Sequence, residues 1–486
     1  MILKVISKYG LAAHLGLLAA FPVAFAPFVD IGTLGGILLW LSFFALIWIF
    51  FDPSIRIGEH TAQARRRVFV SVIRDPAFYL FLLIAVFALV RWLNSGIALW
   101  YDAEHGEWMV KEAEATILPA STPGTGFMPM SVAVAICVLV IGIRHSLGLS
   151  ARIFCGLTAT VLAGAGGLAA SIYSCLETVP MLTQAAKSDF MQTPFAGTAF
   201  GMMLIFSITM GAAAECRKWA SARLPYVLAV AGTSSGLVFF SPPVAVGGYL
   251  VVVLVFALFS FVYCARVGSM GGFARILVLT FLGLLVPAIL IMALATPELR
   301  EFKLHGLDFT AVFPVEYEAL KNALARISKD MWISRPWCGV GLGAFGLNVP
   351  FLATKADWSV LPPHISNAVS GYWTLLAERG IVGCALLVAG IGVLFYSWCA
   401  RLVSAFRYVR NNDDFDTFPF ACFPVVWVAP FIICLAAIEL LFSNVFASSA
   451  FIFAFTVPLV LSAASFPRKV LPPPGMAEES DKNGEG

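Results

Sequence analysis

The chain has 486 residues, of which 60% are hydrophobic and 12% are charged, and its mean hydropathy is +0.89. About a quarter of the residues of soluble domains are charged, so this composition excludes a soluble protein and predicts that most of the chain lies in lipid. The net charge of +3 is small and the basic residues are scattered, which excludes a nucleic-acid-binding surface.

The cysteines do not predict a disulfide framework. All of the ten except Cys175 and Cys338 lie in or beside apolar blocks, where a free cysteine behaves as a small hydrophobic core residue.

About twelve apolar stretches are long enough to cross a bilayer, since a hydrocarbon core about 30 Å thick needs roughly 20 residues per helix. The predicted fold class is an all-α integral membrane protein whose one long extracytoplasmic loop carries amphipathic helices. The stretches are residues 11–29, 34–51, 77–93, 128–143, 153–173, 196–213, 226–240, 244–263, 276–295, 381–398, 420–441 and 445–464.

The distribution of lysine and arginine sets the orientation, because basic loops resist translocation. Most of the basic residues fall in loops that share one side of the membrane, which places both termini in the cytoplasm. The first span is then a retained signal anchor and not a cleaved secretory signal. The predicted domains are residues 1–295 with transmembrane helices one to nine, 296–380 as an extracytoplasmic active-site loop, 381–464 with the last three helices, and 465–486 as a disordered cytoplasmic tail.

The long loop contains a segment with helical periodicity, Val315–Ser334. Leu324, Ile327 and Met331 share one stripe of this segment, and charged residues occupy the opposite face. The pattern predicts an amphipathic helix that lies on the outer membrane surface.

A glycine-rich run follows that helix, with Gly339, Gly341 and Gly343 after Pro336. Glycines at this spacing predict a turn whose backbone comes close to a ligand. The alternative is that they only let the loop fold back on the membrane. A nucleotide site is not favoured, because no strand precedes the run.

His364 is the candidate general base, since histidine changes its protonation near neutral pH and is able to activate a sugar hydroxyl. The competing interpretation is an ordinary surface histidine. A second helix is predicted to follow, with Tyr372 on one face and Glu378 near its end.

Recognition of a diphosphate needs cations near the membrane surface, and the arginine fork suits phosphate better than lysine does. The candidate ligands are Arg91, Arg326, Arg335 and Arg379, each close to an apolar segment. Arg91 lies inside a predicted span, where a charge usually has a function. Its alternative is snorkelling from the helix end to the interface. No CxxC or HExxH motif is present, so we expect no metal and no cofactor.

Taken together, Pro336–Phe345, His364 and the run Ala377-Glu378-Arg379-Gly380-Ile381-Val382-Gly383 resemble the O-antigen ligase and Wzy-type polymerase superfamily. The resemblance implies a GT-C-like glycosyltransferase of the bacterial inner membrane. Its donor would be a polyprenyl-diphosphate-linked glycan and its acceptor a glycan or a lipid, among membrane lipids and other polysaccharide-assembly proteins.

The resemblance also implies roles for individual residues. His364 would act as the base, the arginines would hold the leaving diphosphate, and the remaining candidates for substrate binding are Trp337, Tyr372, Trp373 and Glu378.

The sequence departs from this family at three places. The family's His-Asn pair corresponds here to Val369-Ser370, and its Ser-Arg-Gly turn to Ser241-Pro242-Pro243. The outer loop before the sixth span has Lys187 where the family has an arginine. The chain would therefore be a divergent member. Two functions of other classes stay open: a flippase or transporter of lipid-linked glycans, and a non-catalytic scaffold of envelope synthesis.

Overall fold

The computed structural model describes most of the hydrophobic chain and part of the predicted loop. The residues described are 2–29, 31–51, 60–93, 98–102, 107–111, 123–176, 197–216, 219–241, 243–267, 270–294, 315–341, 344–361, 370–412, 423–442 and 449–465. His364 and the predicted tail after Ser465 lie outside them.

Helices account for nearly all of the described residues, as the long apolar runs predict. The main helices are α1 (Ile2–Phe25), α2 (Ile31–Phe51), α3 (Thr61–Ile73), α4 (Pro76–Leu93), α5 (Pro123–Ile141), α6 (Leu149–Leu176), α8 (Thr198–Cys216), α9 (Arg223–Phe240), α10 (Pro243–Val267), α11 (Met270–Leu294), α13 (Val315–Ser334), α14 (Phe345–Leu352), α15 (Gly371–Asn412), α16 (Phe423–Phe442) and α17 (Ser449–Ser465). Three short helices complete the set, the π-helix η1 (Gly142–Ser146) and the 3₁₀ helices η2 (Ala220–Ala222) and η4 (Asp357–Ser359).

The chain is a multi-pass membrane protein by the length and composition of its helices. Among the described residues, 7 helical segments are long and apolar enough to cross a bilayer, and shorter apolar segments lie in α1, α10, α11, α16 and α17. The seven segments are Gly32–Phe51, Pro76–Leu93, Gly126–Ser146, Leu149–Ser174, Thr198–Glu215, Ala220–Phe240 and Gly371–Ala400. The described part of each predicted span lies mainly in one helix of the bundle.

The all-α prediction holds for the helical bundle, but the chain also contains one β-hairpin. Strands β1 (Ala98–Asp102) and β2 (Glu107–Lys111) pair antiparallel, with Ala98 opposite Lys111 and Asp102 opposite Glu107. Their sequences, Ala-Leu-Trp-Tyr-Asp and Glu-Trp-Met-Val-Lys, are rich in the aromatic and β-branched residues that favour strands.

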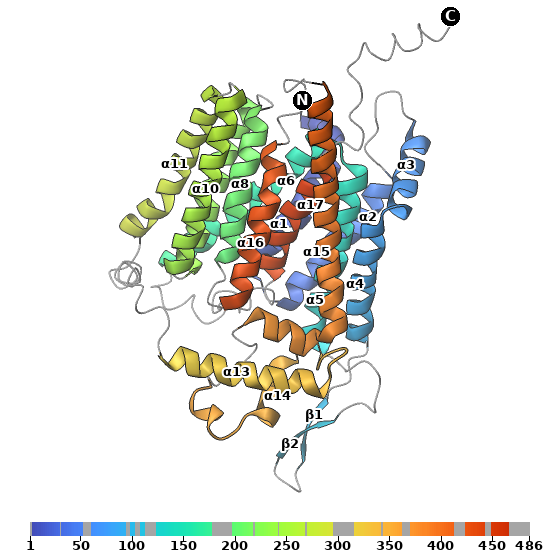
Figure 1. Cartoon of the computed structure of the whole chain (residues 1–486), viewed down its shortest axis with the longest axis vertical. Coiled ribbons are helices and arrows are strands. Elements are labelled where there is room, and N and C mark those ends of the chain that lie inside the picture. Colours follow the sequence, from blue (N-terminus) through green and yellow to red (C-terminus); the bar gives the residue numbers. More distant parts are fainter. Residues whose placement is uncertain are drawn as a thin grey trace, which may run out of the picture.

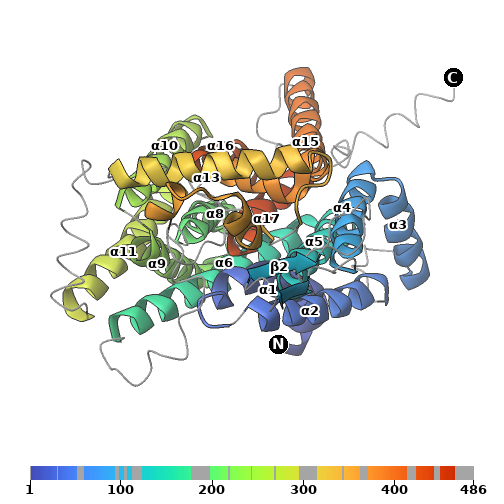
Figure 2. The same cartoon turned by 90° about the horizontal axis from the view of Figure 1, so that it is seen from below.

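The bundle has two different ends (Figure 1). Helices α13 and α14 and the hairpin lie at one end, whereas α3 and the start of α1 lie at the other. Helix α13 runs across the first end, from the side of α10 to α15, as both views show (Figures 1 and 2). We call the end with α13 the capped end and the other the open end.

The apolar stripe of α13 packs on protein. Leu324, Ile327 and Met331 are buried in a small second core together with Phe345 of α14 and Ala377 of α15. The prediction of an amphipathic helix is therefore confirmed, but its apolar face is covered by α14 and α15 rather than by a membrane surface. This packing fixes the predicted loop to the beginning of α15.

Small residues bring the central helices into backbone contact, as in many membrane proteins. A Cβ atom at Gly232 of α9 would lie 1.7 Å from the carbonyl oxygen of Gly164 in α6. A Cβ atom at Gly166 would lie 2.4 Å from the backbone of Ala24 in α1. Helices α1, α6 and α9 therefore form the tightest part of the bundle.

We expect Gly232→Ala to destabilise the protein, because the added methyl group overlaps the α6 backbone and the two helices must separate. Overpacking of this kind typically costs about 1–3 kcal/mol. Thermal unfolding in detergent measures the loss. The matched control is Gly248→Ala in α10, where no atom lies within 4 Å of the new methyl group and stability should hold or rise. Equal unfolding temperatures for the two variants would contradict the packing described.

Candidate functional site

The turn after α13 is bound by backbone hydrogen bonds to a break in α15. The amide of Val340 donates to the carbonyl of Ala377 over 2.8 Å, and the amides of Ile381 and Val382 donate to Pro336 and Trp337 over 2.9 and 3.0 Å. These bonds use the groups that the break leaves without helical partners. We call the paired segments 335–341 and 377–382 the clasp.

Two glycines make the clasp possible. Gly339 and Gly380 have φ angles of 69° and 63°, in the left-handed region that glycine adopts without strain. A Cβ at Gly339 would lie 2.5 Å from the Ala377 carbonyl oxygen, and one at Gly380 would lie 2.4 Å from the Trp337 carbonyl oxygen. The glycine run therefore brings its backbone against α15, whereas Gly343 lies outside the described residues.

Arg91 reaches the clasp from the end of α4. Its side chain is fully buried, its Nη1 donates to the carbonyl of Glu378 over 2.9 Å, and its guanidinium lies 5.5 Å from the ring centre of Phe87. The guanidinium contacts protein backbone, so the described contacts do not support snorkelling to an interface.

Arg379 lies beside Arg91 in the same corner. The Cβ position of Gly383, one turn further along α15, is 2.6 Å from the Cβ of Arg379 and 3.4 Å from the ring of Phe87. The two guanidinium charges are close enough to repel each other. The Nε of Arg379 is buried and has no hydrogen-bond partner among the described residues.

Glu378 connects the clasp to α14. Its Oε1 accepts from the amide of Phe345 over 3.4 Å, at the start of α14, and its carbonyl oxygen accepts from Arg91 and from the amide of Gly341. A carboxylate at a helix N-terminus interacts favourably with the helix dipole. Glu378 therefore joins α4, α14 and α15, while two arginines gather around it.

Arg326 forms ion pairs with acidic residues at the capped end. It donates to Asp357 and, over 3.4 Å, to Asp330. The hydroxyl of Thr354, together with the charge of Arg326, holds the pKa of Asp357 below its usual range. Arg326 thus ties the turn after α14 to α13. The carbonyl of the partly buried Arg335 accepts from the Gly339 amide inside the clasp.

The predicted aromatic residues divide into two kinds. Trp337 is 69% exposed and Tyr372 is 46% exposed, so part of each ring is not covered by protein. The Tyr372 hydroxyl also donates to the Ala437 carbonyl over 3.4 Å. Trp373 packs instead against the second core.

His364 belongs to the segment 362–369, which lies outside the described residues. The described residues that flank this segment in the sequence, Leu361 and Ser370, lie at the capped end. Leu361 packs against the second core, and the carbonyl of Ser370 accepts from the Thr374 amide in the first turn of α15. The role of His364 stays a prediction.

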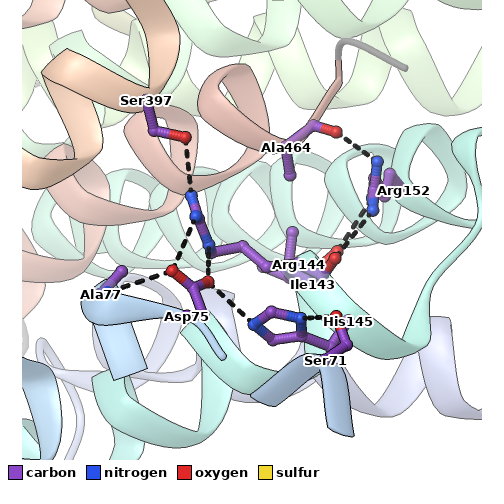
Figure 3. Close-up of polar contacts among 9 residues, drawn as sticks. All are labelled: Ser71, Asp75, Ala77, Ile143, Arg144, His145, Arg152, Ser397 and Ala464. Carbon is purple, nitrogen blue, oxygen red and sulfur yellow. Dashed lines mark hydrogen bonds and ion pairs between the residues drawn. The ribbon is translucent and has the colours of Figure 1, made fainter. Parts of the chain in front are cut away.

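A second polar cluster, which the sequence analysis did not anticipate, lies at the open end (Figure 3). Asp75 is buried at the corner between α3 and α4. Arg144 donates to both of its carboxylate oxygens, over 2.8 and 3.2 Å, and to the Ser397 hydroxyl of α15 over 3.3 Å. The Nε2 of His145 lies 2.9 Å from Asp75, and its Nδ1 lies 2.7 Å from the Ser71 hydroxyl.

The π-helix η1 explains how two consecutive residues, Arg144 and His145, reach one carboxylate. Its wide turn changes the direction of successive side chains, as π-bulges often do at functional positions. Arg152 then donates to the carbonyls of Ile143, Arg144 and Ala464. The cluster joins α4, α6, α15 and α17. No sequence signal predicts a π-helix here, although Asp75 before Pro76 is a helix-start pattern.

Burial raises the pKa of the Asp75 carboxyl, but hydrogen bonds and charges from His145 and Arg144 outweigh burial and hold that pKa well below its ordinary value. Asp75 is therefore ionised, as the bidentate contact with Arg144 requires.

The clasp and its arginines are suited to an anion. The described residues contain no group of three histidine, cysteine or acidic side chains that could hold a metal ion. What converges at the capped end is the buried guanidinium of Arg91, the partly buried Arg379, one carboxylate and exposed aromatic rings. Such a set binds phosphate oxygens and sugar faces.

Comparison of the chain with family models and with curated proteins gives no match. The resemblance to O-antigen ligases and Wzy-type polymerases therefore rests on the motif residues themselves.

We expect Gly380→Ala to open the clasp, because alanine is strained at this φ and its methyl group meets the Trp337 carbonyl. The adjacent Cys338, partly buried, should then react several-fold faster with a maleimide. Gly392→Ala, in the same helix but with no atom within 4 Å, is the control. The Cys338→Ser variant shows which part of the maleimide labelling comes from Cys338. An unchanged labelling rate in Gly380→Ala would contradict the clasp.

We expect Asp75→Asn to destabilise the protein by roughly 3–5 kcal/mol, because Arg144 and His145 stay buried without their carboxylate. The contribution of the ionised Asp75 to the free energy of unfolding is complete above the ordinary carboxyl pKa of about 4. This contribution is lost as the pH falls below that value, since the pKa of Asp75 is depressed in the folded state. Unfolding in detergent between pH 7 and pH 3 should therefore show a smaller acid loss in Asp75→Asn. Asp330→Asn, in an exposed pair with Arg326, is the control and should change stability by less than about 1 kcal/mol.

Proposed function

We propose that this protein is a membrane glycosyltransferase that transfers a glycan from a polyprenyl-diphosphate carrier to an acceptor glycan or lipid. The observation that carries the proposal is the meeting of Arg91 and Arg379 at the capped end. The two residues come from segments far apart in the sequence and lie together beside one carboxylate, that of Glu378.

The electrostatics of this corner favour an anionic ligand. A buried charge is costly unless it is paired and hydrogen-bonded, and here the Nε of Arg379 has no hydrogen-bond partner among the described residues. A diphosphate would supply several acceptor oxygens to the two guanidinium forks. Arg335, whose backbone closes the clasp, is the further cation that we assign to this ligand.

The membrane arrangement that fits this function uses all of the long apolar helices. We propose that α1, α2, α4, α5, α6, α8, α9, α10, α11, α15, α16 and α17 each cross the bacterial inner membrane, which makes twelve spans. The open end, with Arg65, Arg66 and Arg144, then faces the cytoplasm with both termini. The segment 296–380 lies at the outer leaflet, where a polyprenyl carrier presents its diphosphate.

The chemistry assigns one role to each group. His364 accepts the proton of an acceptor hydroxyl as its oxygen attacks the anomeric carbon of the donor. The bond from that carbon to the diphosphate oxygen breaks, and the arginines stabilise the charge that develops on the leaving diphosphate. The exposed rings of Trp337 and Tyr372 stack on sugars.

The decisive experiment offers the purified protein a polyprenyl-diphosphate oligosaccharide with an acceptor and measures new glycosidic bonds by mass spectrometry. We expect transfer by the wild type, loss of transfer in His364→Ala, and about a hundredfold lower rate in Arg379→Gln, the range seen when one charge-stabilising donor is removed. Arg65→Gln at the open end is the matched control and should keep the wild-type rate.

Two results would contradict the proposal. If the wild type forms no glycosidic bond but moves the lipid-linked glycan between the leaflets of vesicles, the protein is a flippase. If it does neither and is required only for the assembly of other envelope proteins, it is a scaffold. Full transfer by His364→Ala would remove the base assignment alone.

A further inference from the structure

A groove of about 520 Å³ lies at the open end of the bundle, away from the clasp. Its walls come from the starts of three helices that run in the same direction, and they include Tyr9 of α1, Phe154, Leu157 and Leu162 of α6, and Trp219 and Ala222 before α9. Arg152, two residues before the lining residue Phe154, donates to the carbonyl of Arg144 in the polar cluster.

The groove changes character along the axis of α6. Its mouth is formed by Tyr9, Trp219 and the exposed hydroxyl residue Ser221, with the Tyr9 ring stacked on Phe154 at 5.0 Å. Leu157 and Leu162 line the deeper part, and the eight helical steps from Phe154 to Leu162 span about 12 Å. Aromatic rings with polar edges prefer the level of the lipid headgroups. The groove therefore has the polarity of a lipid that lies parallel to the helices.

The surroundings of the mouth carry positive charge. The guanidinium groups of Arg223 and Arg275 share a single carboxylate, that of Glu215, at 3.0 and 2.7 Å, and their side chains are 41% and 58% exposed. Basic residues near a membrane surface attract anionic headgroups.

We propose that this groove binds one membrane phospholipid with an anionic headgroup, with an acyl chain along α6 and the phosphate at the mouth. The lipid contacts α1, α6 and α9, which form the tightest part of the bundle. This site does not rest on the transferase function, since it lies at the opposite end from Arg91 and Arg379.

The test reconstitutes the full chain in nanodiscs that hold equal amounts of phosphatidylglycerol and phosphatidylcholine with identical acyl chains. Native mass spectrometry then counts the lipids retained on the protein after transfer to detergent. We expect wild type to keep one phosphatidylglycerol. Val161→Trp and, independently, Ala222→Phe fill the groove and should lower its retention at least tenfold. Val388→Trp, at a 69% exposed position of α15 outside the groove, is the matched control and should keep it.

A second set of variants tests the headgroup. Arg275→Gln should lower the preference for phosphatidylglycerol over phosphatidylcholine about fivefold, while one lipid is still retained. Retention by Val161→Trp or Ala222→Phe equal to wild type, with either variant folded, would overturn the groove as the site. Equal retention of the two lipids by wild type would overturn the anionic assignment.

Discussion

The capped end depends on the contact between the backbones at Gly339 and Gly380. Any side chain at either position would meet a carbonyl oxygen at van der Waals overlap, so the two segments approach only because both residues are glycine. The approach exchanges helical hydrogen bonds of α15 for bonds to the turn after α13. It also directs the carbonyl of Glu378 toward Arg91 and sets Arg379 beside it. The proposed anion site depends on this single constraint.

Helices α4 and α15 pack against each other and are connected at both ends. At the capped end Arg91 donates to Glu378, and at the open end Arg144 links Asp75, at the start of α4, to Ser397 of α15. A helix hardly changes its length, so two such connections fix the axial position of one helix relative to the other. The buried cluster therefore contributes to the geometry of the clasp although it lies about 24 Å away along α4.

The two ends also differ in the ligand that their chemistry favours. The capped end offers one buried and one partly buried arginine and exposed aromatic rings, which suit a diphosphate and the faces of sugars. The open end offers an apolar groove with aromatic residues and half-exposed arginines at its mouth, which suits a phospholipid. The proposed transferase would thus meet its donor at one leaflet while a lipid of the other leaflet supports the central helices.

The sequence by itself determined the helices, because apolar runs of about 20 residues have no other stable form in lipid, and the described part of each predicted span is mainly helical. It also determined the amphipathic stripe of α13 and the glycine turn, since both are local patterns. Only the tertiary structure decided that this stripe faces α14 and α15, that Arg326 is engaged by Asp357, and that Arg91 meets Arg379. No sequence pattern predicted the π-helix that directs Arg144 toward Asp75. These are contacts between distant segments, and their free energy depends on neighbours that local periodicity does not record.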